Sequence, residues 1–241
     1  MEYRKIGFGD SAIILKAGDD ISTNTNNVVR KMLRFFERHR FDGILDYIPS
    51  YNELLISYDP SVTNRESILN SLHLLENEID SIILPESRTI CIPVLYGETG
   101  GPDLREVAGY NSISEDEVIR IHSDMEYYVY MLGFTPGFCY LGGIDERIVT
   151  PRKTTPRLTI PAGSVGIAGN QTGIYPIDSP GGWQIIGNTP VKLFDPLKSP
   201  EFLVNAGDFI KFCPVGRREY LEIEKKVNTG TWKAEIINKS S

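Results

Sequence analysis

Three polar side chains in the second half of the chain have chemistry suited to an active site. Arg157 follows Pro156 in a stretch rich in glycine and proline, and an arginine there can hold a carboxylate or phosphate through two hydrogen bonds. Gln171 both donates and accepts hydrogen bonds, which suits an amide or a lactam. His122 is a candidate to exchange a proton near a pocket. We therefore take His122, Arg157 and Gln171 as candidate catalytic residues and expect Arg157 and Gln171 to face one cavity.

Two of these residues have an alternative structural explanation. His122 lies near the end of a predicted helix, where a histidine can cap the last carbonyl groups. Arg157 can instead form an ion pair on the surface. The sequence leaves both alternatives open.

The stretch from residue 130 to residue 183 is rich in glycine, proline and aromatic residues. Glycine permits backbone conformations closed to other residues and proline fixes φ, so this composition predicts rigid turns between short strands. Such loops suit a small-ligand pocket or a partner surface. Tyr175 and Trp183 can instead belong to a barrel core, which the sequence favours for Trp183. The candidate substrate-binding residues in this stretch are Thr135, Phe138, Tyr140, Pro161, Gly163, Ser164, Tyr175, Ser179, Gly182 and Trp183.

The glycine motifs here match no nucleotide-binding fingerprint. Gly163, Gly166 and Gly169 have the spacing G-x-x-G-x-x-G, and the chain contains no G-x-x-x-x-G-K-[ST] sequence. Residues 162–166 come close to a nucleophile elbow, but proline precedes them and strand-like residues follow, whereas the elbow needs a strand and then a helix. We therefore expect Ser164 to be a turn residue or hydrogen-bond donor, and any ATP site to differ from a P-loop.

The first third of the chain has the pattern of a small α+β sandwich. Apolar residues alternate as in strands and recur with helical spacing in the order β-β-α-β-β-α. Thr63 and Glu66 form a predicted capping box for the second helix. We expect this domain to span residues 1–85.

Residues 84–87 are the predicted linker to a second domain, residues 86–241. After a strand at 88–95, one helix is predicted, capped by Ser114 with Glu117 three residues later. From residue 127 onward we expect short strands and Gly/Pro turns, which is the pattern of a barrel.

Composition narrows the function classes. The formal net charge of −7 argues against a nucleic-acid partner, because affinity for phosphate backbones comes from Lys and Arg. No apolar run has membrane-spanning length, and the first residues do not resemble a signal peptide. Cys91, Cys139 and Cys213 give neither a metal-binding spacing nor a disulfide framework. For this chain of 241 residues we therefore expect a cytoplasmic location and no metal site.

An ordered set of motifs carries a family resemblance. The set comprises Tyr96-Gly97-Glu98, Gly101-Pro102-Asp103-Leu104, Ile121-His122-Ser123, the whole stretch 130–183, Leu193-Phe194-Asp195-Pro196 and Ala206-Gly207-Asp208. The chain thereby resembles the family that includes the B subunit of bacterial 5-oxoprolinase, the kinase inhibitor KipI and allophanate hydrolase subunit 1. It departs from the family pattern at Glu98-Thr99-Gly100-Gly101, where the family has Gly-Gly-Glu-Phe-Gly, and at Cys139, where proline is usual.

The resemblance implies an α+β protein whose second domain is a cyclophilin-like β-barrel. It implies the B subunit of an ATP-dependent 5-oxoprolinase, which hydrolyses 5-oxo-L-proline to L-glutamate with A and C subunits and shares its ATP site with the C subunit. Arg157, Gln171 and backbone N–H groups of the glycine loops are candidates to stabilise negative charge on oxygen. The alternatives are a KipI-like inhibitor of a sporulation histidine kinase, or a component of an allophanate or urea-amide hydrolase.

Overall fold

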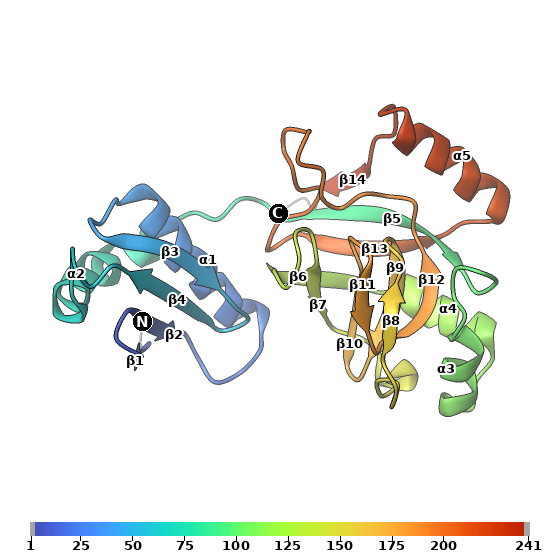
Figure 1. Ribbon diagram of the computed structural model, residues 1–241, viewed down its shortest axis with the longest axis horizontal. Helices are drawn as coiled ribbons and strands as arrows, with labels where there is room; N and C mark the ends of the chain where they lie inside the picture. Colours follow the sequence, from blue (N-terminus) through green and yellow to red (C-terminus); the bar gives the residue numbers. More distant parts are fainter. Residues whose placement is uncertain (1–2, 239–241) are drawn as a thin grey trace. The chain divides into compact units, whose positions relative to one another are not determined.

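The computed structural model describes residues 3–238 and divides into two compact units, Met1–Pro85 and Glu86–Ser241 (Figure 1). Each unit has its own hydrophobic core.

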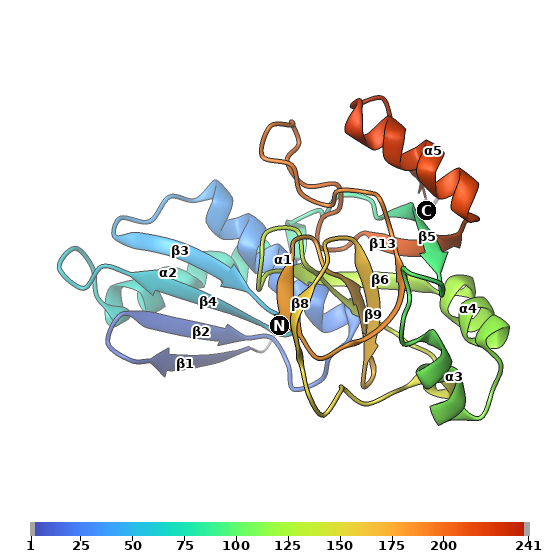
Figure 2. The ribbon, with the colours of Figure 1, turned by 45° about the vertical axis from the view of Figure 1, so that its right-hand side comes forward.

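The first unit is a four-stranded antiparallel sheet with two helices. The strands are β1 (Arg4–Phe8), β2 (Ala12–Lys16), β3 (Ile44–Pro49) and β4 (Glu53–Tyr58), and Figure 2 shows them side by side in the order β1-β2-β4-β3. The helices are α1 (Thr23–Arg38) and α2 (Arg65–Glu78), followed by the 3-10 helix η1 (Ile79–Ser81). This confirms the predicted β-β-α-β-β-α order.

Alternation along β4 explains how this sheet meets its helices. Leu54, Ile56 and Tyr58 are buried, and the residues between them are half-buried, as expected for a sheet with one face on a core. One detail of the prediction is wrong: Asn64, not Thr63, caps α2. The Asn64 side chain accepts a hydrogen bond from the Ser67 N–H at 2.9 Å.

The second unit contains a closed barrel of seven strands. The strands are β5 (Arg88–Tyr96), β6 (Glu126–Leu132), β7 (Cys139–Gly142), β9 (Ser164–Ala168), β10 (Gln171–Ile174), β12 (Gln184–Asn188) and β13 (Phe209–Pro214). Their order is β12-β9-β10-β7-β6-β13-β5, and β12 pairs with β5 again to close the ring. The barrel and the α+β class are therefore confirmed.

Other elements surround the barrel. The short strands β8 (Arg157–Ile160) and β11 (Ser179–Gly181) form a separate ribbon, and β14 (Glu235–Asn238) extends the sheet beside β5. The remaining elements are the helices α3 (Leu104–Asn111), α4 (Glu115–Asp124) and α5 (Arg217–Asn228) and the 3-10 helix η2 (Glu146–Ile148).

The second unit contains more helices than the sequence predicted. Ser114 caps α4 as expected, since its hydroxyl accepts from the Glu117 N–H at 3.1 Å. The prediction missed α3, which packs beside α4, and α5, which lies against β5 (Figure 1). No residue of α5 is fully buried, and only the apolar residues Tyr220, Ile223 and Val227 recur at helical spacing on its half-buried face. No helix within residues 3–238 combines the length and apolar character that a membrane span requires.

Candidate functional site

His122 lies in the core of the second unit. Its side chain is fully buried on α4, and its ring stacks on Phe212 with centroids 4.5 Å apart. Nδ1 is 2.7 Å from the Tyr96 hydroxyl, and Nε2 is 2.7 Å from the Thr172 hydroxyl. Because Thr172 donates to the Gly166 carbonyl, it accepts from Nε2–H, which leaves Nδ1 to accept from Tyr96.

Burial also fixes the charge of this histidine. Desolvation lowers the pKa of His122 to about 3, so the ring is neutral at physiological pH. A group with that pKa is a poor proton shuttle near neutrality, and both ring nitrogens already have partners inside the protein. The structure thus gives His122 a core position in place of the expected position at a pocket, and its side chain does not cap the end of α4.

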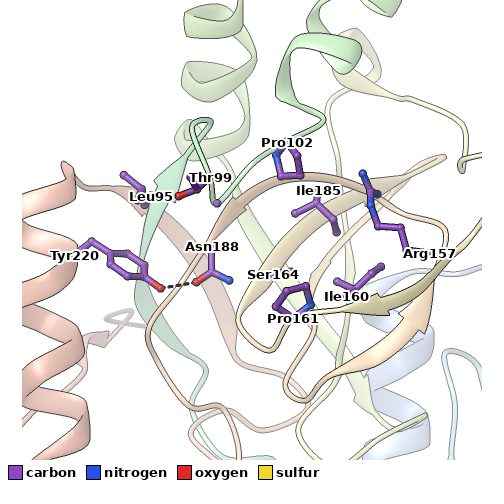
Figure 3. Close-up of a pocket in the computed structure, with 11 residues that line it drawn as sticks. Leu95, Thr99, Pro102, Arg157, Ile160, Pro161, Ser164, Ile185, Asn188 and Tyr220 are labelled. Carbon is purple, nitrogen blue, oxygen red and sulfur yellow. Dashed lines mark hydrogen bonds between the residues drawn. The ribbon is translucent and has the colours of Figure 1, made fainter.

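A pocket of about 280 Å³ opens beside the barrel where the loop after β5 meets β8, β12 and α5 (Figure 3). We call it the Arg157 pocket. Its volume is near the lower limit for small-molecule sites, so it suits a ligand of amino-acid size. It is lined by Leu95, Thr99, Gly100, Pro102, Arg157, Ile160, Pro161, Ser164, Ile185, Asn188 and Tyr220.

Polar groups are spaced along this pocket. In Figure 3, Arg157 lies toward one end, Asn188 and Tyr220 lie toward the other, and Ser164 lies between them. The Tyr220 hydroxyl donates to Asn188 Oδ1 at 2.5 Å, and Asn188 Nδ2 donates to the Ala162 carbonyl at 3.2 Å. Ser164 lines the pocket but is only 2% exposed, and within residues 3–238 its hydroxyl has no hydrogen-bond partner.

A buried carboxylate holds the Arg157 guanidinium. Arg157 Nη2 donates to Asp103 Oδ1 at 2.7 Å, and Lys153 Nζ lies 3.1 Å from the same oxygen. Asp103 Oδ2 accepts from the Ile185 N–H at 2.7 Å. Burial by itself would raise the pKa of Asp103. The hydrogen bonds from Arg157, the Ile185 N–H and Lys153 outweigh that effect, so this pKa is lowered and Asp103 is ionised.

The loop from Gly97 to Asp103 is held along β12. The Gly97 N–H donates to the Ile186 carbonyl at 3.0 Å, and the Asp103 N–H donates to the Ile185 carbonyl at 2.8 Å. A Cβ atom on Gly101 would lie 2.0 Å from the Ile186 carbonyl oxygen, so only glycine fits this approach. The Gly-Pro-Asp motif thereby places the Asp103 carboxylate against the strand.

The turn before β9 places Ser164. Gly163 has φ +80°, and a Cβ atom there would lie 2.2 Å from the Thr189 carbonyl oxygen. The Gly163 N–H donates to the Tyr175 carbonyl at 2.7 Å, and the Ser164 N–H donates to the Pro161 carbonyl at 3.2 Å. These two N–H groups are therefore engaged within the fold, and the expectation that they stabilise a substrate oxygen does not hold for them.

A second pocket, of about 220 Å³, gathers most of the predicted aromatic residues. We call it the aromatic pocket. Of the predicted residues it contains Phe138, Tyr140, Gln171, Tyr175, Gly182 and Trp183, together with Phe134, Arg152, Pro180 and Gly181. Phe138, Tyr175 and Trp183 are buried and meet edge to face, so they form the wall of this pocket as part of a small core.

Arg157 and Gln171 line different pockets, so the expectation that they face one cavity is wrong. Gln171 is the first residue of β10, and the next residue, Thr172, points inward to His122. Successive side chains of a strand point to opposite faces, so Gln171 points outward to the aromatic pocket. Arg157 is held elsewhere, by Asp103.

The other predicted residues divide in the same way. Pro161 and Ser164 line the Arg157 pocket with Arg157 itself, and Gly163 supports the turn between them. Thr135, in the turn before β7, and Ser179, on β11, line neither pocket.

Four further residues contribute to the site without having been predicted. Asp103 belongs to the Gly-Pro-Asp motif, and its position after a glycine-rich turn was a usable signal. Lys153, Asn188 and Tyr220 gave no such signal, because only the folded barrel brings them together. Within residues 3–238 no group of three or more His, Cys, Asp or Glu side chains is placed to hold a metal ion.

Comparisons with known proteins agree on one family. Residues 3–204 match the family described as the carboxyltransferase domain, subdomain C and D. The chain is 42% identical to the 5-oxoprolinase B subunit of Bacillus subtilis, over 95% of this chain and 99% of that protein. It is 40% identical to the 5-oxoprolinase B subunit of Escherichia coli O157:H7, over 86% of this chain and 93% of that protein.

Among solved structures, the urea carboxylase of Kluyveromyces lactis aligns with a TM-score of 0.79 at 21% identity, over 98% of this chain and 24% of that one. This likeness supports the fold alone. The family match and the two relatives go further: the chain belongs to the carboxyltransferase subdomain C and D family, in the group that includes the 5-oxoprolinase B subunits.

Proposed function

We propose that this chain is the B subunit of an ATP-dependent 5-oxoprolinase, which opens 5-oxo-L-proline to L-glutamate together with A and C subunits. The match to a protein of that name, over nearly the full length of both chains, supports the assignment. The structural observation that carries it is the Arg157 pocket, in which a guanidinium, a hydroxyl and a side-chain amide share one small cavity.

The polar groups of this pocket complement the two ends of 5-oxoproline. The molecule has a carboxylate on the carbon next to the lactam nitrogen, and the lactam carbonyl lies on the other side of that nitrogen. Arg157 uses Nη2 for Asp103 and makes a long 3.4 Å contact from Nη1 to the Trp183 carbonyl, so N–H groups remain for a carboxylate. The lactam both donates and accepts hydrogen bonds. Ser164 offers it a hydroxyl, and Asn188 offers the N–H and the oxygen lone pair that its bonds to Ala162 and Tyr220 leave unused.

Opening a lactam is slow because amide resonance makes its carbonyl a poor electrophile. Phosphorylation of the lactam oxygen by ATP would supply the missing leaving group. The Arg157 pocket does not suit the triphosphate by itself, because its one charged side chain, already paired with Asp103, can hold a single carboxylate but cannot offset several negative charges. We therefore assign substrate recognition to this pocket and expect ATP to be held mainly outside it, with the C subunit.

The experiment is reconstitution. The chain is co-expressed with its A and C partners, and glutamate released from 5-oxoproline is measured with and without ATP. We expect ATP-dependent turnover by the assembled complex and none by the purified chain. Robust turnover by the chain alone would contradict the shared site. Consumption of urea or allophanate without consumption of 5-oxoproline would favour the amide-hydrolase alternative.

A further inference from the structure

Asp103 is the buried centre of the charged groups beside the Arg157 pocket. Its side chain is 5% exposed, while those of Arg157 and Lys153 are 30% and 21% exposed. Lys153 also pairs with Glu106, with Nζ and Oε2 2.8 Å apart. Asp103 thus accepts hydrogen bonds both from Arg157, which lines the pocket, and from Lys153, which lies outside it.

The three contacts of Asp103 fix its orientation completely. One carboxylate oxygen accepts from both cations, and the other accepts from the Ile185 N–H of β12. Because the backbone of Asp103 also donates to the Ile185 carbonyl, the residue is attached to the strand at two points. The position of a guanidinium bound to this carboxylate is therefore fixed relative to strand β12 of the barrel.

Such an anchor matters for ligand binding because a free arginine side chain is flexible. Ordering it costs conformational entropy, and a pre-ordered side chain avoids that cost when the ligand arrives. The anchoring contact leaves other N–H groups of Arg157 free to bind the ligand. The carboxylate also offsets the charge of Arg157, so the pocket presents directed hydrogen bonds more than bare positive charge.

We infer that Asp103 is a positioning residue for substrate recognition: it holds the Arg157 guanidinium where the carboxylate of the substrate binds. The inference rests on the proposed 5-oxoprolinase function and adds a residue that acts through Arg157 without itself touching substrate. Figure 3 shows the Arg157 pocket, with Arg157 toward one end.

The test uses Asp103→Asn in the assembled complex. Asparagine has the shape of aspartate but one acceptor oxygen. Its oxygen can accept a hydrogen bond either from the Ile185 N–H or from the two cations, but not from both sides. In either orientation its NH₂ group, which is itself a donor, faces another donor. We expect KM for 5-oxoproline to rise about ten- to a hundred-fold, with kcat changed much less.

Glu106→Gln is the matched control. Glu106 contacts Lys153 and Gln184, is largely exposed, and acts on Arg157 only through its charge, without a hydrogen bond or ion pair to it among residues 3–238. This variant removes a carboxylate from the same cluster and should leave KM within about three-fold of the wild type, given the small worth of exposed ion pairs. Asp103→Glu keeps the charge but displaces it, and it should give a KM between those of the wild type and Asp103→Asn. This variant replaces Asp103→Asn in the test if the asparagine variant does not assemble with its partners.

A carboxylate-free ligand separates positioning from general damage. 2-Pyrrolidinone has the lactam ring of 5-oxoproline without its carboxylate, and its inhibition constant is measured for wild type and variant complexes. We expect Asp103→Asn to leave this constant unchanged. An equal weakening of 2-pyrrolidinone and 5-oxoproline would overturn the inference, because the role of Asp103 would then be structural.

The proposed function and the positioning role of Asp103 fail in different ways. A wild-type complex that releases no glutamate from 5-oxoproline overturns the proposed function and the inference with it. An active wild-type complex whose KM is unchanged by Asp103→Asn overturns the inference and leaves the proposed function standing.

Discussion

Acid should destabilise the second unit through His122, a residue that its sequence context suggested for catalysis. The folded protein holds this ring neutral, with a pKa of about 3, whereas the unfolded chain has the ordinary value of about 6.5. As pH falls below 6.5, the unfolded state takes up a proton that the folded state does not. The free energy of unfolding therefore has its full value above pH 6.5 and decreases as pH falls toward 3.

The size of this loss follows from the shift. For each pH unit below the unfolded-state pKa of about 6.5, the free energy of unfolding decreases by about 1.4 kcal/mol. At pH 5 this residue alone should therefore lower it by about 2 kcal/mol. His122→Gln provides the comparison. Glutamine does not titrate, and it can still donate to Thr172 and accept from Tyr96.

The assay is denaturant unfolding at pH 7.5 and pH 5, followed by tryptophan fluorescence. Both tryptophans, Trp183 and Trp232, lie in the second unit, so the signal reports on the unit that contains His122. Groups other than His122 titrate in both proteins and cancel in the difference. Wild type should lose about 2 kcal/mol more than His122→Gln between the two pH values. Equal losses would refute the assignment of a buried neutral histidine.

Two further predictions concern the backbone. Gly143 has φ +93° but no neighbour within 4 Å, so Gly143→Ala should lower the free energy of unfolding by about 1–2 kcal/mol through backbone strain alone. Gly163→Ala should lower it by about 1–3 kcal/mol more, because the added Cβ atom would also meet a backbone oxygen. Thermal unfolding of the two variants measures this, and equal losses would contradict the contact. Limited proteolysis should first cut between residues 81 and 87, where Ile83 is 84% exposed, and an early cut within 130–183 would contradict that boundary.

Local patterns predicted the first unit well because its elements are close in sequence and most of them, including β2, α1, β4 and α2, bury one apolar face. The capping signal of Ser114 likewise depends only on its neighbours. The closed barrel came from the family resemblance, since no spacing of short strands reveals which edges meet. Helix α5 was missed although Tyr220, Ile223 and Val227 recur at helical spacing, because this short apolar face is only half-buried and charged residues surround it.

The candidate site was harder to predict because its geometry depends on distant residues. Asp103 and Arg157 are 54 residues apart and meet only because a glycine-rich loop lies along β12. Gln171 resembled a pocket partner of Arg157, yet strand alternation turns it to another pocket. His122 was expected near a pocket or as a cap of the helix end, but it lies in the core, where its ring stacks on Phe212, far along the chain.

The central claim is that the Arg157 pocket binds the carboxylate of 5-oxoproline, and kinetics of Arg157→Ala in the assembled complex tests it most directly. Loss of a charge-assisted contact costs about 1.5–3 kcal/mol, or roughly ten- to a hundred-fold in affinity. Arg157→Lys should not restore it, because an ammonium cannot reproduce the planar guanidinium. Arg152→Ala is the control, since Arg152 is exposed and lines the aromatic pocket.

We predict that KM for 5-oxoproline rises at least about ten-fold in Arg157→Ala and Arg157→Lys and stays near the wild-type value in Arg152→Ala. A complex whose KM and turnover are both unaffected by Arg157→Ala would contradict the claim, because the substrate would then bind elsewhere.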